Sequence, residues 1–353
     1  MPSLVGSEMC IRDRGDVEPP KDGPIGIELE HVSFAYPGGK TVLHDLNLCI
    51  KPGEKLAIVG LNGAGKTTTT LMLLGLTEPS GGSASIAGID CTRNPLEVKR
   101  IVGYLPDNMG FYADMTGREN LRMTGRMNGL YGEALERRMD ELLERVGMTD
   151  AADRKAGTYS KGMKQRLGIA DILMKGPEVL IMDEPTNGID PEGMRELMAL
   201  IRALAEKDGM TILISSHQLH QIQQICDRVG IFTQGRLIAC GRIEELAYQL
   251  AQENDCRLEI GAQPGGDALL RCLQGVEGVL EAQPDDHGLV QVRAVRGRNA
   301  ALVRALVDGG FTLTHLRQTS DDLDEIYSKY FEKAGERDAG GEGGKRNHDR
   351  KGA

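Results

Sequence analysis

Apolar residues recur along this chain in two kinds of short run, each typical of a different kind of strand. At residues 27–34 and 41–50 they alternate with polar residues, which predicts two strands of an antiparallel sheet with one solvated face. Pro37, Gly38 and Gly39 predict the turn between them. Unbroken apolar runs at 55–59, 179–182 and 211–214 predict buried parallel strands. Shorter runs predict further strands at 83–87, 101–105, 229–233 and 236–239.

Apolar residues at helical spacing fill the segment from about residue 115 to residue 176, with predicted helices at 118–130, 133–146 and 163–174. Met123, Met127 and Met139 on these helices are expected to be packing residues. Other helices are predicted at 68–75, 191–207 and 218–226. The alternation of strands and helices predicts an α/β fold with a parallel sheet covered by helices. The segment at about 107–176 is then a helical insertion into that fold.

From about Asp255 the pattern changes to that of a smaller domain. Strand-like runs at 257–260, 279–283, 289–295 and 312–318 alternate with helical segments at 267–273 and 300–307. This βαββαβ order resembles a ferredoxin-like α+β domain, with one more helix expected at 321–331. We therefore predict one domain at 25–250 and an accessory domain at 255–333. Residues 335–353 are Gly-rich and charged, and they are expected to form a disordered tail.

Composition narrows the class of protein without changing this picture. The 353 residues are 40% hydrophobic and 27% charged, as in ordinary globular proteins. The net charge of −10 argues against a surface that coats nucleic acid. Seven scattered cysteines, none in CxxC spacing, indicate a reduced cytoplasmic protein without structural zinc. Since no apolar run approaches the length of a membrane span, work at a membrane would need a partner that crosses it.

The first residues are expected to be foreign to the fold. The segment from Val5 to Asp13 matches a translation of a transposase-type sequencing adapter, and it lacks the apolar core of a signal peptide. Residues up to about Arg14 are therefore interpreted as a non-native leader, with an ordinary disordered tail as the alternative. The Pro-, Gly- and Asp-rich stretch up to residue 24 is expected to be a linker.

A glycine-rich segment at 60–68, GLNGAGKTT, carries the strongest chemical signal. It contains the pattern G-x-x-x-x-G-K-[ST], in which glycines let successive backbone N–H groups point toward one anion. Lys66 supplies a mobile cation between the outer phosphates, and the Thr67 hydroxyl can bind Mg²⁺. The strand before the loop and the helix after it are the required setting. The sequence therefore predicts a nucleoside triphosphate site that includes Gly60, Asn62, Gly63, Gly65, Lys66, Thr67 and Thr68.

Two carboxylates follow the apolar strand at 179–182. They lie at the carboxyl end of a parallel strand, where ligands bind, so Asp183 can hold Mg²⁺ directly or through water. Glu184 lies just beyond and can polarise a water for attack on a γ-phosphate. The alternative is a solvated Asp-Glu turn before Pro185, which the phosphate loop upstream disfavours.

Four further residues have both a chemical and a structural interpretation. Ser160 and Gly162 can present a hydroxyl and N–H groups to a phosphate, or Ser160 can simply cap the following helix. His217 follows a strand and can sense a γ-phosphate, or it can cap a helix. Tyr36 by itself is most often a core or turn aromatic.

Taken in order, the motifs of residues 27–250 resemble those of the ABC ATPase family. Residues 60–67 resemble the Walker A motif, 181–184 the end of Walker B, and 159–163 the family signature, usually LSGGQ. Residues 187–190 resemble the D-loop, which brings in Asp190, and 215–217 resemble the switch-histidine region. Tyr36 matches the aromatic residue that stacks on adenine.

The resemblance implies a fold, ligands and partners. The fold is an α/β P-loop NTPase of ABC type with an antiparallel β subdomain and a helical insertion, plus the small C-terminal α+β domain. The ligands are ATP and Mg²⁺, with Glu184 and His217 as catalytic residues. In the family, the signature of one protomer closes on ATP held by the other, so a homodimer with two composite sites is expected.

A finer resemblance concerns the kind of ABC protein. The segments YLPDNMGFY, TGRENL and YSKGMKQR are similar to those of bacterial exporter ATPases, which pair with a separate membrane permease. The chain is thus expected at the cytoplasmic face of the cell membrane, held there by the permease, and without a nucleic-acid partner.

Two motifs depart from the usual residues of the family. The signature has Lys161 in place of the first glycine and Met163 in place of glutamine, while Ser160 and Gly162 remain. At the Q-loop, Asp107 stands where the family usually has glutamine. Because aspartate is shorter and charged, we expect a water bridge from Asp107 to Mg²⁺ rather than direct ligation.

Two other classes of protein remain as alternatives to an exporter subunit. A soluble non-transport ABC ATPase usually has a long coiled-coil insertion or two tandem ATPase units, and the sequence has neither. A nucleotide-sensing regulatory module keeps Lys66 but need not keep Glu184 and His217, and both are present. Neighbouring permease genes would separate these alternatives.

Overall fold

The computed structural model describes residues 26–217, 222, 225–246, 255–285, 288–295 and 297–319. The chain divides into two compact units, Met1–Arg242 and Ile243–Ala353. The domain limits expected from the sequence, 25–250 and 255–333, stay a prediction. The expected leader and linker at 1–24, the helix at 321–331 and the tail at 335–353 lie outside the described residues, as does most of the helix expected at 218–226.

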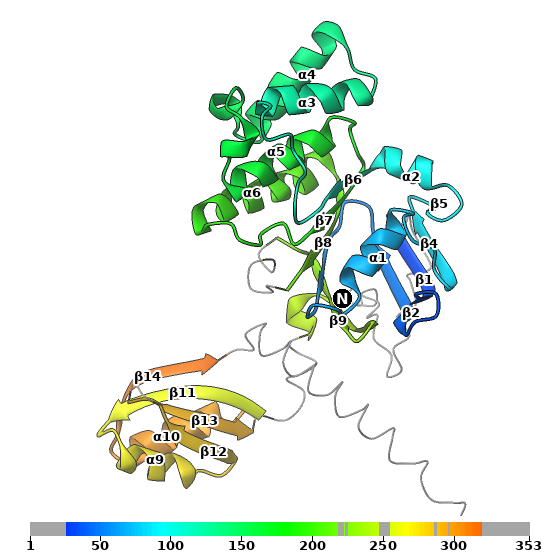
Figure 1. Ribbon diagram of the computed structural model, residues 1–353. Helices are drawn as coiled ribbons and strands as arrows, with labels where there is room; N and C mark the ends of the chain where they lie inside the picture. Colours follow the sequence, from blue (N-terminus) through cyan, green and yellow to red (C-terminus); the bar gives the residue numbers. More distant parts are fainter. Residues whose placement is uncertain are drawn as a thin grey trace, which may run out of the picture. The chain divides into compact units, whose positions relative to one another are not determined.

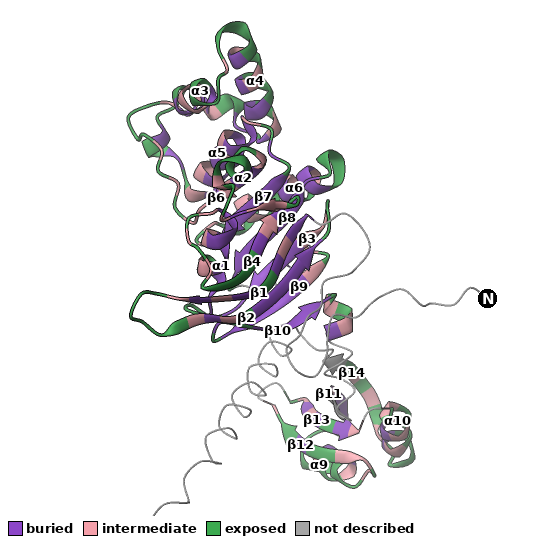
Figure 2. Ribbon diagram, turned by 90° about the vertical axis from the view of Figure 1, so that its right-hand side faces the viewer, coloured by how far each residue is buried: buried purple, intermediate pink, exposed green. Residues whose placement is uncertain are grey.

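A mostly parallel sheet forms the centre of the first unit, with strand order β10-β9-β3-β8-β7-β6 (Figure 1). Neighbouring strands are parallel except β9 and β10, which pair antiparallel at one edge. The strands are β3 Lys55–Val59, β6 Val102–Leu105, β7 Val179–Asp183, β8 Thr211–Ser216, β9 Arg228–Thr233 and β10 Arg236–Gly241. Every residue of β7 and β8 is buried, and the central strands are mostly purple in Figure 2. Burial of both faces explains the apolar runs at 179–182 in β7 and 212–214 in β8.

A second sheet in this unit has the order β2-β1-β4-β5 and is antiparallel throughout. Its strands are β1 Ile27–Ala35, β2 Thr41–Ile50, β4 Gly81–Ile86 and β5 Ile89–Asp90. Leu29 of β1 and Leu46 of β2 share one buried cluster with Ile58 of β3 and Phe232 of β9. This cluster joins the two sheets, and the antiparallel pair expected from the alternating pattern is confirmed.

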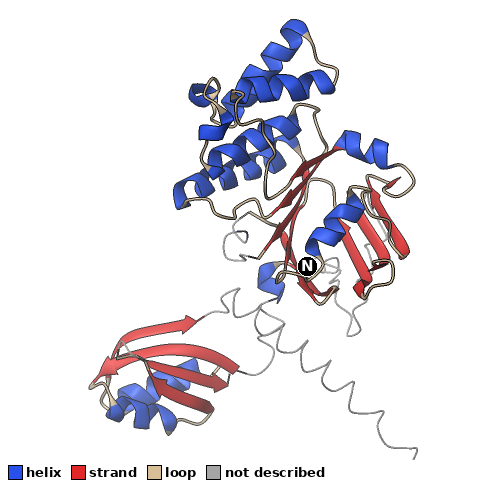
Figure 3. Ribbon diagram, in the orientation of Figure 1, coloured by secondary structure: helices blue, strands red, loops and turns tan. Residues whose placement is uncertain are grey.

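The helices of the first unit follow the expected order, with one addition. They are α1 Lys66–Leu73, α2 Pro95–Ile101, α3 Gly117–Met127, α4 Gly132–Arg145, α5 Lys161–Leu173 and α6 Pro191–Asp208, with short 3-10 turns η1 Thr149–Ala151 and η2 Ala156–Thr158. α3, α4 and α5 come between β6 and β7 along the chain. α5 packs against β6, and α3 and α4 lie beyond the end of the central sheet (Figure 3). The expected helical insertion is thus confirmed. α2 was not expected, because Val98 is the one buried residue among its seven and gives no periodic signal.

The start of α3 has a complete capping box. The Thr116 hydroxyl accepts from the Glu119 N–H at 3.1 Å, and the Glu119 carboxylate accepts from the Thr116 N–H at 2.7 Å. At the other end of the helix, the expectation that Met127 packs in the core is wrong. Met127 is 76% exposed, whereas Met139 of α4 is fully buried, because Met127 is the last residue of α3 and lies beyond its buried stripe.

The second unit contains an antiparallel sheet of order β12-β13-β11-β14 with two helices. Its elements are β11 Asp255–Gln263, α9 Asp267–Gln274, β12 Val279–Pro284, β13 Val290–Val295, α10 Asn299–Asp308 and β14 Thr312–Thr319. Ile260 and Val292 of the sheet pack with Leu269 of α9 and Leu302 of α10 in a buried cluster of their own. The βαββαβ order expected from the sequence is confirmed. In the described parts of both units, no helix is long and apolar enough to cross a membrane.

Candidate nucleotide site

The loop between β3 and α1 has the backbone shape that its glycines predict. Gly63 and Gly65 have φ angles of 83° and 105°, in the left-handed region that other residues rarely adopt. A Cβ on Gly65 would lie 2.5 Å from Leu43 Cδ2, and a Cβ on Gly60 would lie 2.6 Å from the Phe232 carbonyl oxygen. β2 and β9 therefore press close to the loop and leave no room for a side chain at either position.

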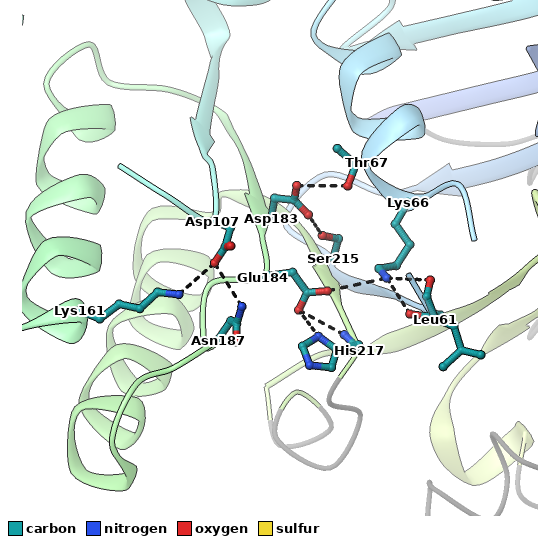
Figure 4. Close-up of polar contacts among 11 residues, drawn as sticks. Leu61, Lys66, Thr67, Asp107, Lys161, Asp183, Glu184, Asn187, Ser215 and His217 are labelled. Atoms are coloured by element: carbon teal, nitrogen blue, oxygen red, sulfur yellow. Dashed lines mark hydrogen bonds and ion pairs between the residues drawn. The ribbon is translucent and has the colours of Figure 1, made fainter. Parts of the chain in front are cut away.

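Lys66 lies at the start of α1 with its ammonium turned back over this loop (Figure 4). Its Nζ donates to the carbonyl oxygens of Gly60 at 2.6 Å and Leu61 at 3.4 Å, and it is 3.7 Å from Glu184 Oε1. The side chain is only 6% exposed, and this burial lowers the pKa of Lys66, while the carboxylates of Glu184 and Asp183 act to raise it. A buried cation among carbonyl oxygens is suited to receive a further anion, so the residues present fit a polyphosphate.

Asp183 ends β7 and gathers two hydroxyl groups around its buried carboxylate. Thr67 Oγ1 donates to Asp183 Oδ2 at 3.3 Å, and the Ser215 hydroxyl donates to Oδ1. Ser215 lies directly opposite Asp183 in the parallel register of β7 and β8. Thr67 and Asp183, the two residues expected to hold Mg²⁺, therefore lie together. Their oxygen donors are the type of ligand that this hard cation prefers, so the site fits it.

Glu184 follows with an unusual backbone and two charged or polar partners. Its φ of 48° lies in the left-handed region, and its N–H donates to the Ser215 carbonyl at 3.0 Å. Its Oε2 is 2.8 Å from His217 Nδ1 and accepts from the His217 N–H at 3.3 Å. Such a conformation at a residue other than glycine persists only where the surroundings enforce it. Here Lys66 and His217 hold the carboxylate, and Ser215 holds the backbone.

Asp107, just after β6, turns its carboxylate toward α5 and the segment after β7 (Figure 4). Its Oδ1 is 3.1 Å from Lys161 Nζ and accepts from Asn187 Nδ2 at 3.5 Å. Gln165 Nε2 donates to the backbone carbonyl of Asp107 at 3.2 Å. The carboxylate is thus engaged by α5 and by residue 187.

The remaining expected residues have local structural roles as well. Ser160 is the N-cap of α5, with its hydroxyl accepting from the Met163 N–H at 3.2 Å. Gly162 follows in the first turn, where a Cβ would lie 3.3 Å from Ile189 Cγ2. Asp190 caps α6 by accepting from the Gly193 N–H at 3.1 Å. The ring of Tyr36 is 52% exposed and meets Phe34 edge to face, with 4.8 Å between centroids.

Three residues of this region were not among the expected site residues. Ser215 and Asn187 contact Asp183 and Asp107, and Lys161 was noted only as a departure from the family signature. For Ser215 a signal existed, because the polar ends of neighbouring parallel strands meet at one sheet edge. The contacts of Lys161 and Asn187 both depend on the path of the loop that carries Asp107, which no periodic pattern reports.

Comparison with known proteins shows which family has this arrangement. The family model described as ABC transporter matches residues 43–187. The bacitracin transport ATP-binding protein BcrA of Bacillus licheniformis is 37% identical over 304 residues, covering 86% of this chain and 96% of that protein. The linearmycin resistance ATP-binding protein LnrL of Bacillus subtilis (strain 168) is 37% identical over 235 residues, covering 66% of this chain and 75% of that protein.

A solved structure agrees with these relatives. CbiO1 from Clostridium perfringens, described as part of the ABC transporter complex cbiONQ, superimposes with a TM-score of 0.59 at 28% identity. The match covers 65% of this chain and 96% of that chain. The sequence relatives, the fold and the phosphate loop agree, and the chain belongs to the ABC transporter family as one of its ATP-binding ATPase subunits.

Proposed function

We propose that this chain hydrolyses MgATP at the site around Lys66 and Glu184 and so powers the export of a compound through a separate membrane permease. The observation that carries the proposal is the position of Glu184, whose carboxylate lies 3.7 Å from Lys66 Nζ and 2.8 Å from His217 Nδ1. The relative named for bacitracin transport supports a role in transport, and the relative named for linearmycin resistance favours export over uptake.

Each expected residue has a role in the proposed reaction. The triphosphate lies over the loop N–H groups of Asn62, Gly63 and Gly65, with Lys66 and Thr68 beside it and adenine stacked on Tyr36. Thr67 and Asp183 hold Mg²⁺, which supplies charge neutralisation for the phosphates when it is bound. Glu184 accepts a proton from the water that attacks the γ-phosphorus, and the bond to the β,γ-bridging oxygen breaks to give ADP and phosphate. His217 keeps the Glu184 carboxylate oriented toward that water.

The site is proposed to be completed by a second copy of the chain. Ser160 and Gly162 at the start of α5, and Asp190 before α6, would approach ATP held by the other copy. Closure would then require bound ATP, and hydrolysis with release of products would reopen the dimer. Asp107 would report the state of the γ-phosphate to the helical insertion, directly or through water.

The permease is proposed to dock where the helical insertion meets the rest of the first unit. A pocket of about 280 Å³ lies there, lined on the insertion side by Thr124, Asn128, Asp171, Ile172 and Lys175 and on the other by Leu74, Leu76, Lys99, Val102 and Tyr104. Leu76 is 56% exposed, so the rim offers apolar surface. The chain would thus be peripheral at the cytoplasmic face of the membrane.

The ATPase assignment is tested with Glu184→Gln and Lys66→Ala. The glutamine variant should bind ATP but lose turnover by a factor of about 10² to 10⁴, because an amide cannot accept the proton. The alanine variant should bind ATP more weakly, since it lacks the buried cation. Glu144→Gln, an exposed carboxylate on α4, is the matched control and should hydrolyse ATP normally. Wild-type turnover by Glu184→Gln would show that another group is the base.

The transport assignment is tested by reconstitution with a candidate permease, sought among the genes that neighbour the gene for this chain. ATPase stimulation by the permease should fall when Leu76 or Met127 is changed to glutamate, while the basal rate persists. If no membrane protein binds or stimulates the wild type, a soluble non-transport ATPase or a nucleotide-sensing module becomes the better assignment.

A further inference from the structure

Two of the positions at which this chain departs from the usual family motifs touch each other. Asp107 replaces the usual glutamine of the Q-loop, and Lys161 replaces the first glycine of the signature. They are 54 residues apart in sequence, yet Lys161 Nζ lies 3.1 Å from Asp107 Oδ1. An acid and a base that replace uncharged residues and then form an ion pair point to a linked role.

The pair also includes the segment after β7. Asn187 Nδ2 donates to the same Asp107 oxygen at 3.5 Å, and the Lys161 side chain lies over Gly188, where a Cβ would be 3.4 Å from Lys161 Cδ. Gly188 has a φ of 68°, so a side chain would be strained there for a second reason. One carboxylate thus ties together the loop after β6, the start of α5 and the turn that leads to α6.

The ion pair between Lys161 and Asp107 is weak enough for Lys161 to exchange Asp107 for another anion. Lys161 and Asp107 are 33% and 34% exposed, so water screens their attraction. A triphosphate carries more negative charge than one carboxylate, so it attracts the ammonium group more strongly at the same distance. The four-carbon stem of Lys161 lets its ammonium move while α5 stays in place.

We propose that Lys161 is a shared cation that pairs with Asp107 of its own chain when no triphosphate faces α5, and moves to the γ-phosphate of ATP held by a second copy when the dimer closes. This inference rests on the composite site of the proposed function. Because the Asp107 carboxylate competes for Lys161, it opposes closure. Loss of the pair on closure releases the loop after β6, which leads directly into the helical insertion, and so links ATP on one copy to the insertion of the other.

The test uses the Glu184→Gln variant as parent and measures the ATP concentration that gives half-maximal dimer by light scattering. Asp107→Asn frees Lys161 and should lower this concentration by about two- to fivefold, the range expected for one exposed pair. Lys161→Met removes the cation and should raise it, and Lys161→Arg, which keeps the charge, should return it toward the parent. In the Lys161→Met background, where the carboxylate has no lysine to compete for, Asp107→Asn should no longer lower this concentration.

The matched control is a second Lys–Asp pair, which lies at the amino ends of β3 and β9, away from the site at the carboxyl ends of the strands. Lys55 Nζ and Asp227 Oδ1 are also 3.1 Å apart, so Asp227→Asn should leave the ATP concentration for dimerisation unchanged. The inference about Lys161 would be overturned, with the composite site left standing, if Asp107→Asn did not shift the ATP concentration for half-maximal dimer. The same would follow if Asp107→Asn still lowered that concentration in a chain without Lys161. A parent that stays monomeric at every ATP concentration would overturn the composite site, and this inference with it.

Discussion

The hydrogen bond from Ser215 to Asp183 allows a quantitative test of how the end of β7 is held. Ser215→Ala removes the hydroxyl donor but changes little volume, and it leaves Asp183 with Thr67 as its remaining hydroxyl partner. Ser215 is 1% exposed and Asp183 9%, so water does not replace the lost donor easily. A hydrogen bond to a charged group contributes about 1.5–3 kcal/mol, and a buried group left without it loses that amount. The end of β7 should therefore open locally about ten to a hundred times more often in the variant than in the wild type.

Hydrogen exchange followed by mass spectrometry is the appropriate assay, because it reports local opening and the chain contains no tryptophan for fluorescence. Peptides covering β7 and β8 should exchange faster in the variant by the stated factor. Ser83→Ala is the matched control, since Ser83 Oγ donates to Glu30 Oε2 at 3.3 Å. This bond also joins a serine hydroxyl to a carboxylate, but it is exposed to solvent. Its effect should stay within about 0.5 kcal/mol. Equal effects from the two serines would refute the argument that burial sets the magnitude.

Four further predictions concern the rest of the chain. Arg228→Met leaves the nearly buried Glu54 without its partner at 3.1 Å and should cost about 3 kcal/mol, seen by calorimetry as earlier melting; unchanged melting would contradict it. Burial raises the pKa of Cys91 to about 12, so native protein at pH 8 should be alkylated at Cys272 far sooner than at Cys91. The folded state should also lose stability as the pH rises from 9.0 toward about 12, because only the unfolded thiol ionises there. A chain cut after residue 254 should still bind a fluorescent ATP analogue, since all the nucleotide motifs precede that point; loss of binding by a folded truncation would count against two independent units.

The parts of this fold that the sequence predicted are those that depend on repeated local signals. β7 and β8 are buried on both faces, so the residues at 179–182 and 212–214 are all apolar and form visible runs. The loop before Lys66 was visible because phosphate binding fixes residue type and spacing together. In contrast, α2 has one buried residue and β5 has two residues in all, so neither leaves a periodic trace.

The contacts of the site were only partly accessible to such reasoning. The sequence predicts that Asp183 lies at a strand end. Its contact with Ser215, which is 32 residues away in sequence, depends on the register between β7 and β8. The pairing of Asp107 with Lys161 depends on how the irregular loop after β6 lies against the start of α5. Long-range pairs of this kind carry no local pattern, and three-dimensional coordinates are needed to find them.

The positive φ of Glu184 has a consequence for anyone who engineers this chain. The left-handed backbone there is disfavoured for glutamate by about 1–2 kcal/mol, while glycine and, to a lesser degree, asparagine adopt it readily. Selection for thermal tolerance and selection for turnover would therefore favour different residues at one position. On the role proposed for Glu184, a Glu184→Gly variant that a heat screen enriched through its relaxed backbone would be an inactive ATPase, although it would also lose the contacts of the carboxylate with Lys66 and His217.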